Sequence, residues 1–198
     1  DAVFYPNIYN QPETLMQEGW HHELEDPDEP LIYKGVVYNE MKGAFSSPEQ
    51  VLFRKIQESL YPDTPYANES GGDPDYIPEL TQEDFLAFHG KYYHPSNSYI
   101  YLYGNGEIYN HLKFINEEYL CRFDKAEIDS EITKQVPFPE MRRQEIQYSI
   151  SPQDNPEGKT YLSLNFAVGN STDPFQYLAF DILKYLLLDN PAAPLKKA

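Results

Sequence analysis

The sequence predicts an α+β fold in two layers, with helices packed on an antiparallel or mixed sheet. Three observations support this prediction. Apolar residues recur at helical spacing in several segments. Three other short segments are strand-like. The order along the chain is helix-rich, strand, helix, polar segment, strand, strand, helix, which is typical of helices that cover a sheet.

Helix signals are clearest in the first half of the chain. Residues 35–44 carry Val36, Val37, Met41 and Ala44 at helical spacing. The next helix begins with Ser47 as N-cap and Pro48 at its first position. Thr81 and Asp84 resemble a capping box that opens a helix over 81–92. Further helices are expected over 10–19, 108–119 and 175–186.

Strand signals lie mainly in the second half. Residues 98–103 alternate tyrosines with Ile100 and Leu102, which favours a strand covered on both faces. Residues 146–151 and 160–168 are also strand-like, and the Pro- and Gly-containing segment between them predicts a hairpin. A further short strand is expected at 22–25.

The polar, proline-containing stretch after residue 124 shows no clear period, which indicates a linker between domains. We therefore predict a first domain over 1–125, a linker at 126–145 and a second domain from 146 to 198. The chain starts at Asp1 inside an apolar stretch and stops just after a helical pattern. We expect it to be an internal piece of a longer protein, incomplete at both ends.

Composition narrows the possible partners. The chain has 15 Lys and Arg against 32 Asp and Glu, a formal net charge of −17. So acidic a surface repels phosphate groups, and nucleic acid and anionic membranes are therefore not expected partners. No apolar run reaches the length of a membrane span. The single cysteine excludes an intrachain disulfide framework and any site built from several cysteines.

Glu40 is the main candidate for chemistry. It lies between Val36, Val37 and Ala44 on one helical stripe, so a carboxylate interrupts an apolar face. Burying a carboxylate costs free energy unless it is paired, hydrogen-bonded or bound to a metal. Two alternatives stay open at this point: a glutamate at the edge of the stripe that reaches water, and one paired with a basic side chain.

No complete metal site or nucleophilic motif is found in the sequence. A zinc-protease helix needs two histidines at the right spacing around a glutamate, and the five histidines do not provide it. His89 lies on the predicted buried face of its helix, where we expect a hydrogen-bonded core histidine. Ser70-Gly71-Gly72-Asp73 is too short for a phosphate-binding loop and is expected to be a turn.

Several blocks of the chain resemble one protein family. They are Gln17–Trp20, Tyr33–Phe45, Ser70–Pro74, Ile77–Thr81, Tyr92–Asn97 and Tyr103–Asn105. These blocks are similar to the presequence-protease branch of the M16 (pitrilysin, insulinase-like) zinc metallopeptidases. The resemblance covers residues 1–105 most strongly and continues more weakly to the end.

The resemblance implies a zinc-dependent endopeptidase of unfolded or presequence-like peptides. Family members bind zinc through an inverted His-x-x-Glu-His motif and a distant glutamate, and Glu40 matches that third ligand. The motif, with its general-base glutamate, is expected upstream of Asp1, so no catalytic residue is expected within this chain. Zn²⁺ is accordingly expected in the intact protein and absent or weakly bound in this piece alone.

The resemblance also suggests that Ser70, Gly71 and Gly72 lie near the substrate. The expected partners are peptides and the remaining parts of the same M16 chain, and the expected compartment is the bacterial cytoplasm, with an organellar matrix as the alternative. A second hypothesis is a non-catalytic M16-like scaffold or interaction half without a zinc site. A His-x-x-Glu-His motif upstream of Asp1 would support the enzyme, and its absence would support the scaffold.

Overall fold

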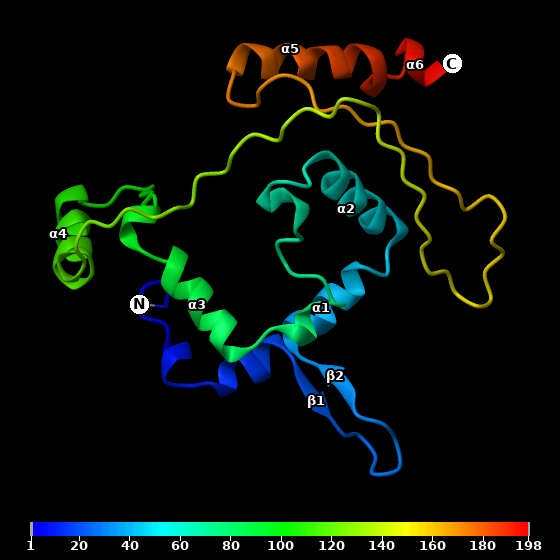
Figure 1. Cartoon of the computed structure of the whole chain (residues 1–198). Helices are drawn as coiled ribbons and strands as arrows, with labels where there is room; N and C mark the ends of the chain where they lie inside the picture. The colour runs from blue at the N-terminus through cyan, green and yellow to red at the C-terminus, as the bar shows by residue number, and fades with distance from the viewer. Residues whose placement is uncertain (1, 198) are drawn as a thin grey trace. The chain divides into compact units, whose positions relative to one another are not determined.

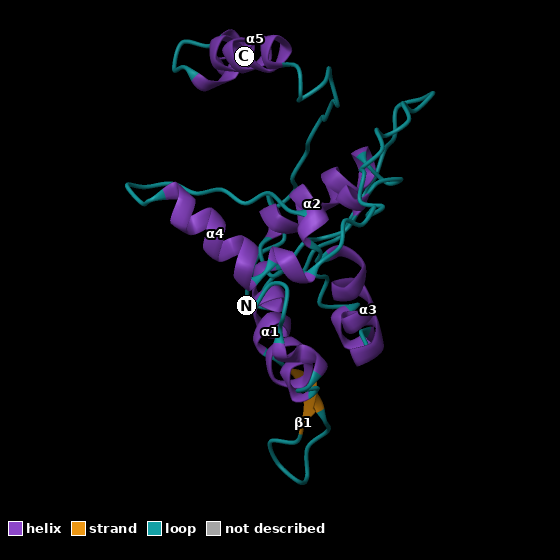
Figure 2. Cartoon of the chain, turned by 90° about the vertical axis from the view of Figure 1, so that its left-hand side faces the viewer, coloured by secondary structure: helices purple, strands orange, loops and turns teal. Residues whose placement is uncertain are grey.

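The computed structural model describes residues 2–197. Asp1, ahead of which the His-x-x-Glu-His motif is expected, lies outside the described residues, as does Ala198. The chain divides into two compact units, residues 1–156 and 157–198. Figure 1 shows the course of the chain, and Figure 2 shows that helices and loops make up most of it. None of the helices in the described part is long and apolar enough to cross a bilayer.

A small hairpin and one helix form the start of the first unit. Strands β1 (His21–Glu23) and β2 (Ile32–Lys34) pair antiparallel, with His22 opposite Tyr33. The hairpin leads directly into α1 (Val36–Ala44) through Gly35. Gly35 has φ 150°, and a Cβ there would overlap the Gly19 carbonyl and lie 2.7 Å from the Trp20 Cα. Only glycine allows this close approach of two backbone segments.

The following helices begin where their capping residues predict. Helix α2 (Pro48–Leu60) starts after Ser47, whose hydroxyl accepts a hydrogen bond from the Gln50 N–H at 3.5 Å. Helix α3 (Gln82–Tyr92) has the complete capping box of Thr81 and Asp84. Both N-termini therefore satisfy backbone donors that a helix leaves unpaired. The short 3-10 turns η3 (Pro65–Ala67) and η4 (Ile77–Glu79) connect the two helices.

The remaining described residues form three more α-helices and several short turns. Helix α4 (Ile108–Glu118) belongs to the first unit, and α5 (Pro174–Lys184) and α6 (Pro194–Lys197) belong to the second. The short 3-10 and π turns are η1 (Asn7–Tyr9), η2 (Leu15–Gly19), η5 (Pro95–Asn97), η6 (Leu120–Arg122) and η7 (Tyr185–Asp189). The helical part of the predicted fold is thus confirmed, with boundaries within a few residues.

The sheet is smaller than predicted. Residues 98–103, 146–151 and 160–168 are not strands; they run as loop without ladder partners. The described residues contain one two-stranded sheet, β1–β2, so helices do not cover a sheet layer here. An isolated extended segment leaves its backbone groups to water, and it becomes a strand only where a second strand aligns with it. The proposed domain boundaries stay a prediction.

The described chain buries little apolar surface. Tyr38, Ile77 and Ala193 are its buried apolar residues. Helix α5 leaves Phe175, Leu178 and other large apolar side chains exposed. Much of the surface that the sequence pattern assigns to a core therefore faces solvent.

Candidate metal-ligand helix and glycine turn

Glu40 lies on the exposed face of α1. The helix is anchored by the opposite face: Tyr38 is 9% exposed and contacts Tyr33 with ring centroids 5.9 Å apart. Val36 and Val37, which share the stripe with Glu40, are exposed, and so is Glu40. The expectation of a carboxylate buried in an apolar stripe is therefore wrong for this structure, because the hairpin packs against Tyr38 and leaves that stripe uncovered.

The Glu40 carboxylate is available to a ligand. Within residues 2–197 it has no hydrogen-bond or ion-pair partner, so the alternative of a glutamate paired with a basic side chain is not seen. No group of three His, Cys, Asp or Glu side chains in the described part could hold a metal. The described residues thus do not form a complete zinc site.

The predicted turn at Ser70–Gly72 packs against the same helix. The Gly72 N–H donates to the Glu69 carbonyl at 3.0 Å. A Cβ on Gly71 would overlap the Met41 Sδ, so the turn backbone lies directly on the side chain that follows Glu40. Gly72 has φ 91°, a conformation that favours glycine, and a Cβ there would lie 3.0 Å from Ile77 Cγ1.

An ion pair connects this turn to α2. Arg54 pairs with Asp73, and their side chains are only 17% and 11% exposed. The Arg54 guanidinium also lies 4.8 Å from the Phe45 ring centroid, a cation–π geometry. Sequence reasoning missed this pair, since nothing in the local spacing connects two residues 19 positions apart.

His89 and His21 make hydrogen-bond contacts that join separate segments of the first unit. His89 lies between two groups: its Nδ1 is 2.9 Å from the Tyr9 hydroxyl and its Nε2 is 2.8 Å from the Val3 carbonyl. The predicted hydrogen bonding of His89 is confirmed, but the ring is only partly buried and is not a core residue. His21 Nδ1 lies 2.7 Å from the Met16 carbonyl, which accepts a hydrogen bond from it. These rings fasten the first residues of the chain to α3 and to the hairpin.

Resolved pKa shifts lie at surface interactions away from Glu40. The hydrogen bond that Lys34 donates, at 2.8 Å, lowers the pKa of Glu23, and the same contact raises the pKa of Lys34. Hydrogen bonds from the Thr81 hydroxyl and N–H lower the pKa of Asp84. The two carboxylates with lowered pKa, Glu23 and Asp84, therefore contact a neighbouring strand and cap a helix.

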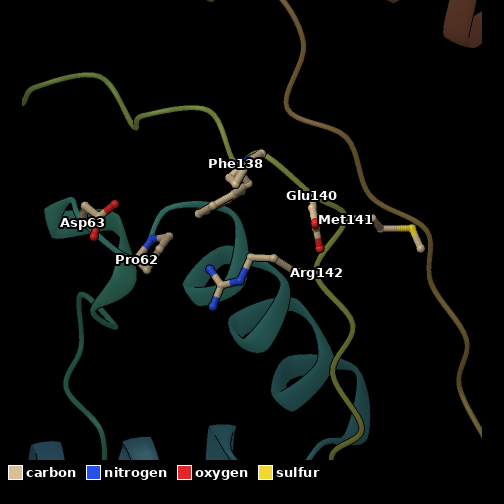
Figure 3. A pocket seen from close by; sticks show the side chains of 7 residues that line it. Pro62, Asp63, Phe138, Glu140, Met141 and Arg142 are labelled. Atoms are coloured by element: carbon tan, nitrogen blue, oxygen red, sulfur yellow. The ribbon is translucent and has the colours of Figure 1, made fainter.

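A separate hollow of about 520 Å³ lies between the end of α2 and residues 138–142, and Figure 3 shows its lining. Arg142 extends toward α2, where its Nη1 donates to the Ser59 carbonyl at 2.7 Å, and Met141 points away from it. Asp63 and Gln135 exchange two hydrogen bonds nearby. Part of the predicted linker thus contacts the end of α2 and the loop after it, within the first unit.

Comparison with known proteins gives the family. Residues 79–198 match the family described as Peptidase M16 inactive domain, which is more than half of the chain. The chain belongs to the M16 peptidase family. Glu40 and the Ser70–Gly72 turn lie before the matched residues.

Curated relatives of this M16 chain align over its whole length. Protein HypA of Clostridium perfringens is 58% identical over 198 residues. Presequence protease 1, chloroplastic/mitochondrial, of Arabidopsis thaliana is 41% identical, and the mitochondrial presequence protease of Xenopus laevis is 39% identical. The alignments cover 100% of this chain but only 20%, 18% and 20% of the relatives. The chain therefore spans about a fifth of their length, and the resemblance to the presequence-protease branch is confirmed.

Proposed function

We propose that this M16 chain is a section of a zinc-dependent metalloendopeptidase and that Glu40 is one of its zinc ligands. The observation that carries the proposal is the alignment of all 198 residues with proteins named presequence proteases. The Glu40 carboxylate is exposed on α1 and has no partner among the described residues, so the structure shows the alternative of a glutamate that reaches water, and the side chain is open to a ligand from elsewhere in the longer protein.

Glu40 would contribute charge and geometry. A carboxylate oxygen donated from a helix offsets part of the cation's charge and fixes one direction of its coordination. When bound, zinc polarises the scissile carbonyl and acidifies the attacking water. The two histidine ligands and the general base would come from a His-x-x-Glu-His motif elsewhere in the longer protein. The uncovered stripe of Val36, Val37 and Ala44 would then pack against the segment that brings them.

Peptides are the proposed substrates. The net charge of −17 attracts basic segments, as presequence-like peptides are, and disfavours acidic ones. Two of the relatives named above are called presequence proteases, which supports the same substrate class. The proposed compartment is the bacterial cytoplasm, since Protein HypA is bacterial, with an organellar matrix as the alternative.

A non-catalytic scaffold is the second candidate, because one observation favours it. The matched family is described as the inactive domain of M16 peptidases, and it covers residues 79–198. On this alternative the exposed face of α1 would serve only assembly. A longer sequence that lacks His-x-x-Glu-His would support the scaffold, and one that contains it would support the enzyme.

The test is Glu40→Gln in the full-length protein, with Glu13→Gln as an exposed control on another segment. Glutamine keeps the shape but removes the charge, so we expect bound zinc to fall well below one per chain and kcat/KM for a basic peptide to fall by about 100-fold or more. Metal content is measured by elemental analysis and cleavage by mass spectrometry. Wild-type zinc content and turnover in Glu40→Gln would remove Glu40 from the site.

A further inference from the structure

The Ser70–Gly72 turn is held between two helices of the first unit. On one side Gly71 packs on Met41 of α1, the residue after Glu40. On the other side Asp73 pairs with Arg54 of α2. The turn is therefore attached to the helix that carries the proposed ligand, and its attachment depends on residues outside that helix.

The Arg54–Asp73 pair is enclosed. The two side chains are 17% and 11% exposed, and the Phe45 ring lies 4.8 Å from the guanidinium. Among the described residues, Arg54 Nε is buried without a hydrogen-bond partner. Removing one member would leave the other charge poorly hydrated, which costs more free energy than breaking an exposed pair.

Asp73 also organises the chain that leaves the turn. Its Oδ1 accepts from the Asp75 N–H at 2.9 Å. Its carbonyl accepts from the N–H groups of Tyr76 at 2.9 Å and Ile77 at 2.8 Å. Ile77 is 4% exposed and lies beside Gly72. One aspartate thus connects α2, the glycine turn and a buried anchor.

We propose that Arg54 and Asp73 are positioning residues, whose ion pair keeps the Ser70–Gly72 turn against Met41 so that its backbone receives the peptide substrate beside the Glu40 helix. This inference rests on the proposed function. Ser70 and Gly71 are exposed, so the turn is accessible to a peptide. Bare glycine backbone lets an extended peptide approach closely and pair through main-chain hydrogen bonds. Arg54 and Asp73 act through the turn and need not touch the substrate.

The test uses Arg54→Gln, Asp73→Asn and the double variant in the full-length protein. Lys55→Gln is the matched control, because Lys55 is the next residue and pairs with Glu58 at the surface. Each single variant should raise KM for a basic peptide by about 10-fold with kcat and zinc content little changed, because peptide positioning is lost while the metal is kept. The double variant should be no worse than the worse single, because both remove the same contact.

Amide hydrogen exchange supplies a readout that needs no catalysis. Residues 69–77 should exchange faster in Arg54→Gln and Asp73→Asn and at the wild-type rate in Lys55→Gln. If the wild-type protein cleaves no peptide, the proposed function fails alone, and exchange still decides whether the pair holds the turn. Unchanged exchange or a wild-type KM in the single variants overturns the inference. Loss of zinc in step with activity also overturns it, because the pair would then support the whole fold.

Discussion

Two regions of the chain differ in how their backbone N–H and C=O groups are hydrogen-bonded. One is the region of residues 20–97, and the other consists of the strand-like stretches 98–103, 146–151 and 160–168. The first region is fastened by caps, a hairpin ladder and side-chain contacts such as the hydrogen bond from Trp20 Nε1 to the Leu80 carbonyl at 3.0 Å. The strand-like stretches have no ladder, and Tyr99 and Leu162 are 105% and 97% exposed. The first region thus combines local caps with contacts between distant segments, whereas the strand-like stretches have no partner strand.

This contrast bears on function. The proposed ligand, the glycine turn and the Arg54–Asp73 pair all lie in the region with its own contacts. The other stretches expose large apolar residues, which leaves apolar surface open to a partner segment. The arrangement of α1, the glycine turn and the ion pair is therefore expected to persist within residues 20–97, and the proposed zinc site would need further ligands from outside them.

The largest effect is expected from Gly35→Ala. The added Cβ would overlap the Gly19 carbonyl at a φ of 150°, so backbone has to move and α1 loses its attachment. We expect the free energy of unfolding to fall by about 3 kcal/mol, measured by chemical denaturation. Gly43→Ala is the control in the same helix: a Cβ there meets nothing within 4 Å, so stability should stay equal or rise slightly. Equal behaviour of the two variants would contradict the close approach at Gly35.

An intermediate effect is expected at the cap of α3. Thr81→Ala removes the side-chain acceptor of the capping box and should cost about 1 kcal/mol, measured by denaturation. The pH dependence has a definite sign. Because the folded-state pKa of Asp84 is lowered, its stabilisation is complete above the ordinary aspartate pKa of about 4 and is lost as pH falls through the lower folded value. Thr81→Ala removes the hydroxyl donor but keeps the backbone N–H, so it should weaken this acid sensitivity in part, and an unchanged acid profile would exclude the Thr81 hydroxyl as its cause.

The smallest effect is expected in the strand-like stretches. Tyr101 is 84% exposed, so Tyr101→Ala in this chain should change the free energy of unfolding by less than about 0.5 kcal/mol. The same substitution in the full-length protein should cost more if another strand covers the segment. Amide exchange of residues 98–103 in the two proteins checks the explanation directly. If residues 98–103 of the isolated chain were protected from amide exchange as strongly as α1, the proposed difference between the two regions would be wrong.

The sequence predicted what depends on neighbours along the chain. Ser47, Thr81 and Asp84 mark helix starts because a cap acts over three residues, and α1 and α2 begin within one residue of the expected positions. Pairing over longer separations was not predictable. The partner of Arg54 and the exposure of Glu40 both depend on which face of a helix a distant segment covers, and spacing within the helix does not contain that information. For the same reason strand propensity at 98–103 did not make a strand.

The role of Glu40 is tested most directly by locating zinc in crystals of the full-length protein through its anomalous scattering. We expect a single strong peak about 2.0–2.2 Å from a Glu40 carboxylate oxygen, with the remaining ligands supplied by segments outside these 198 residues. A fully occupied zinc bound elsewhere, with the Glu40 side chain in open solvent, would contradict the proposal.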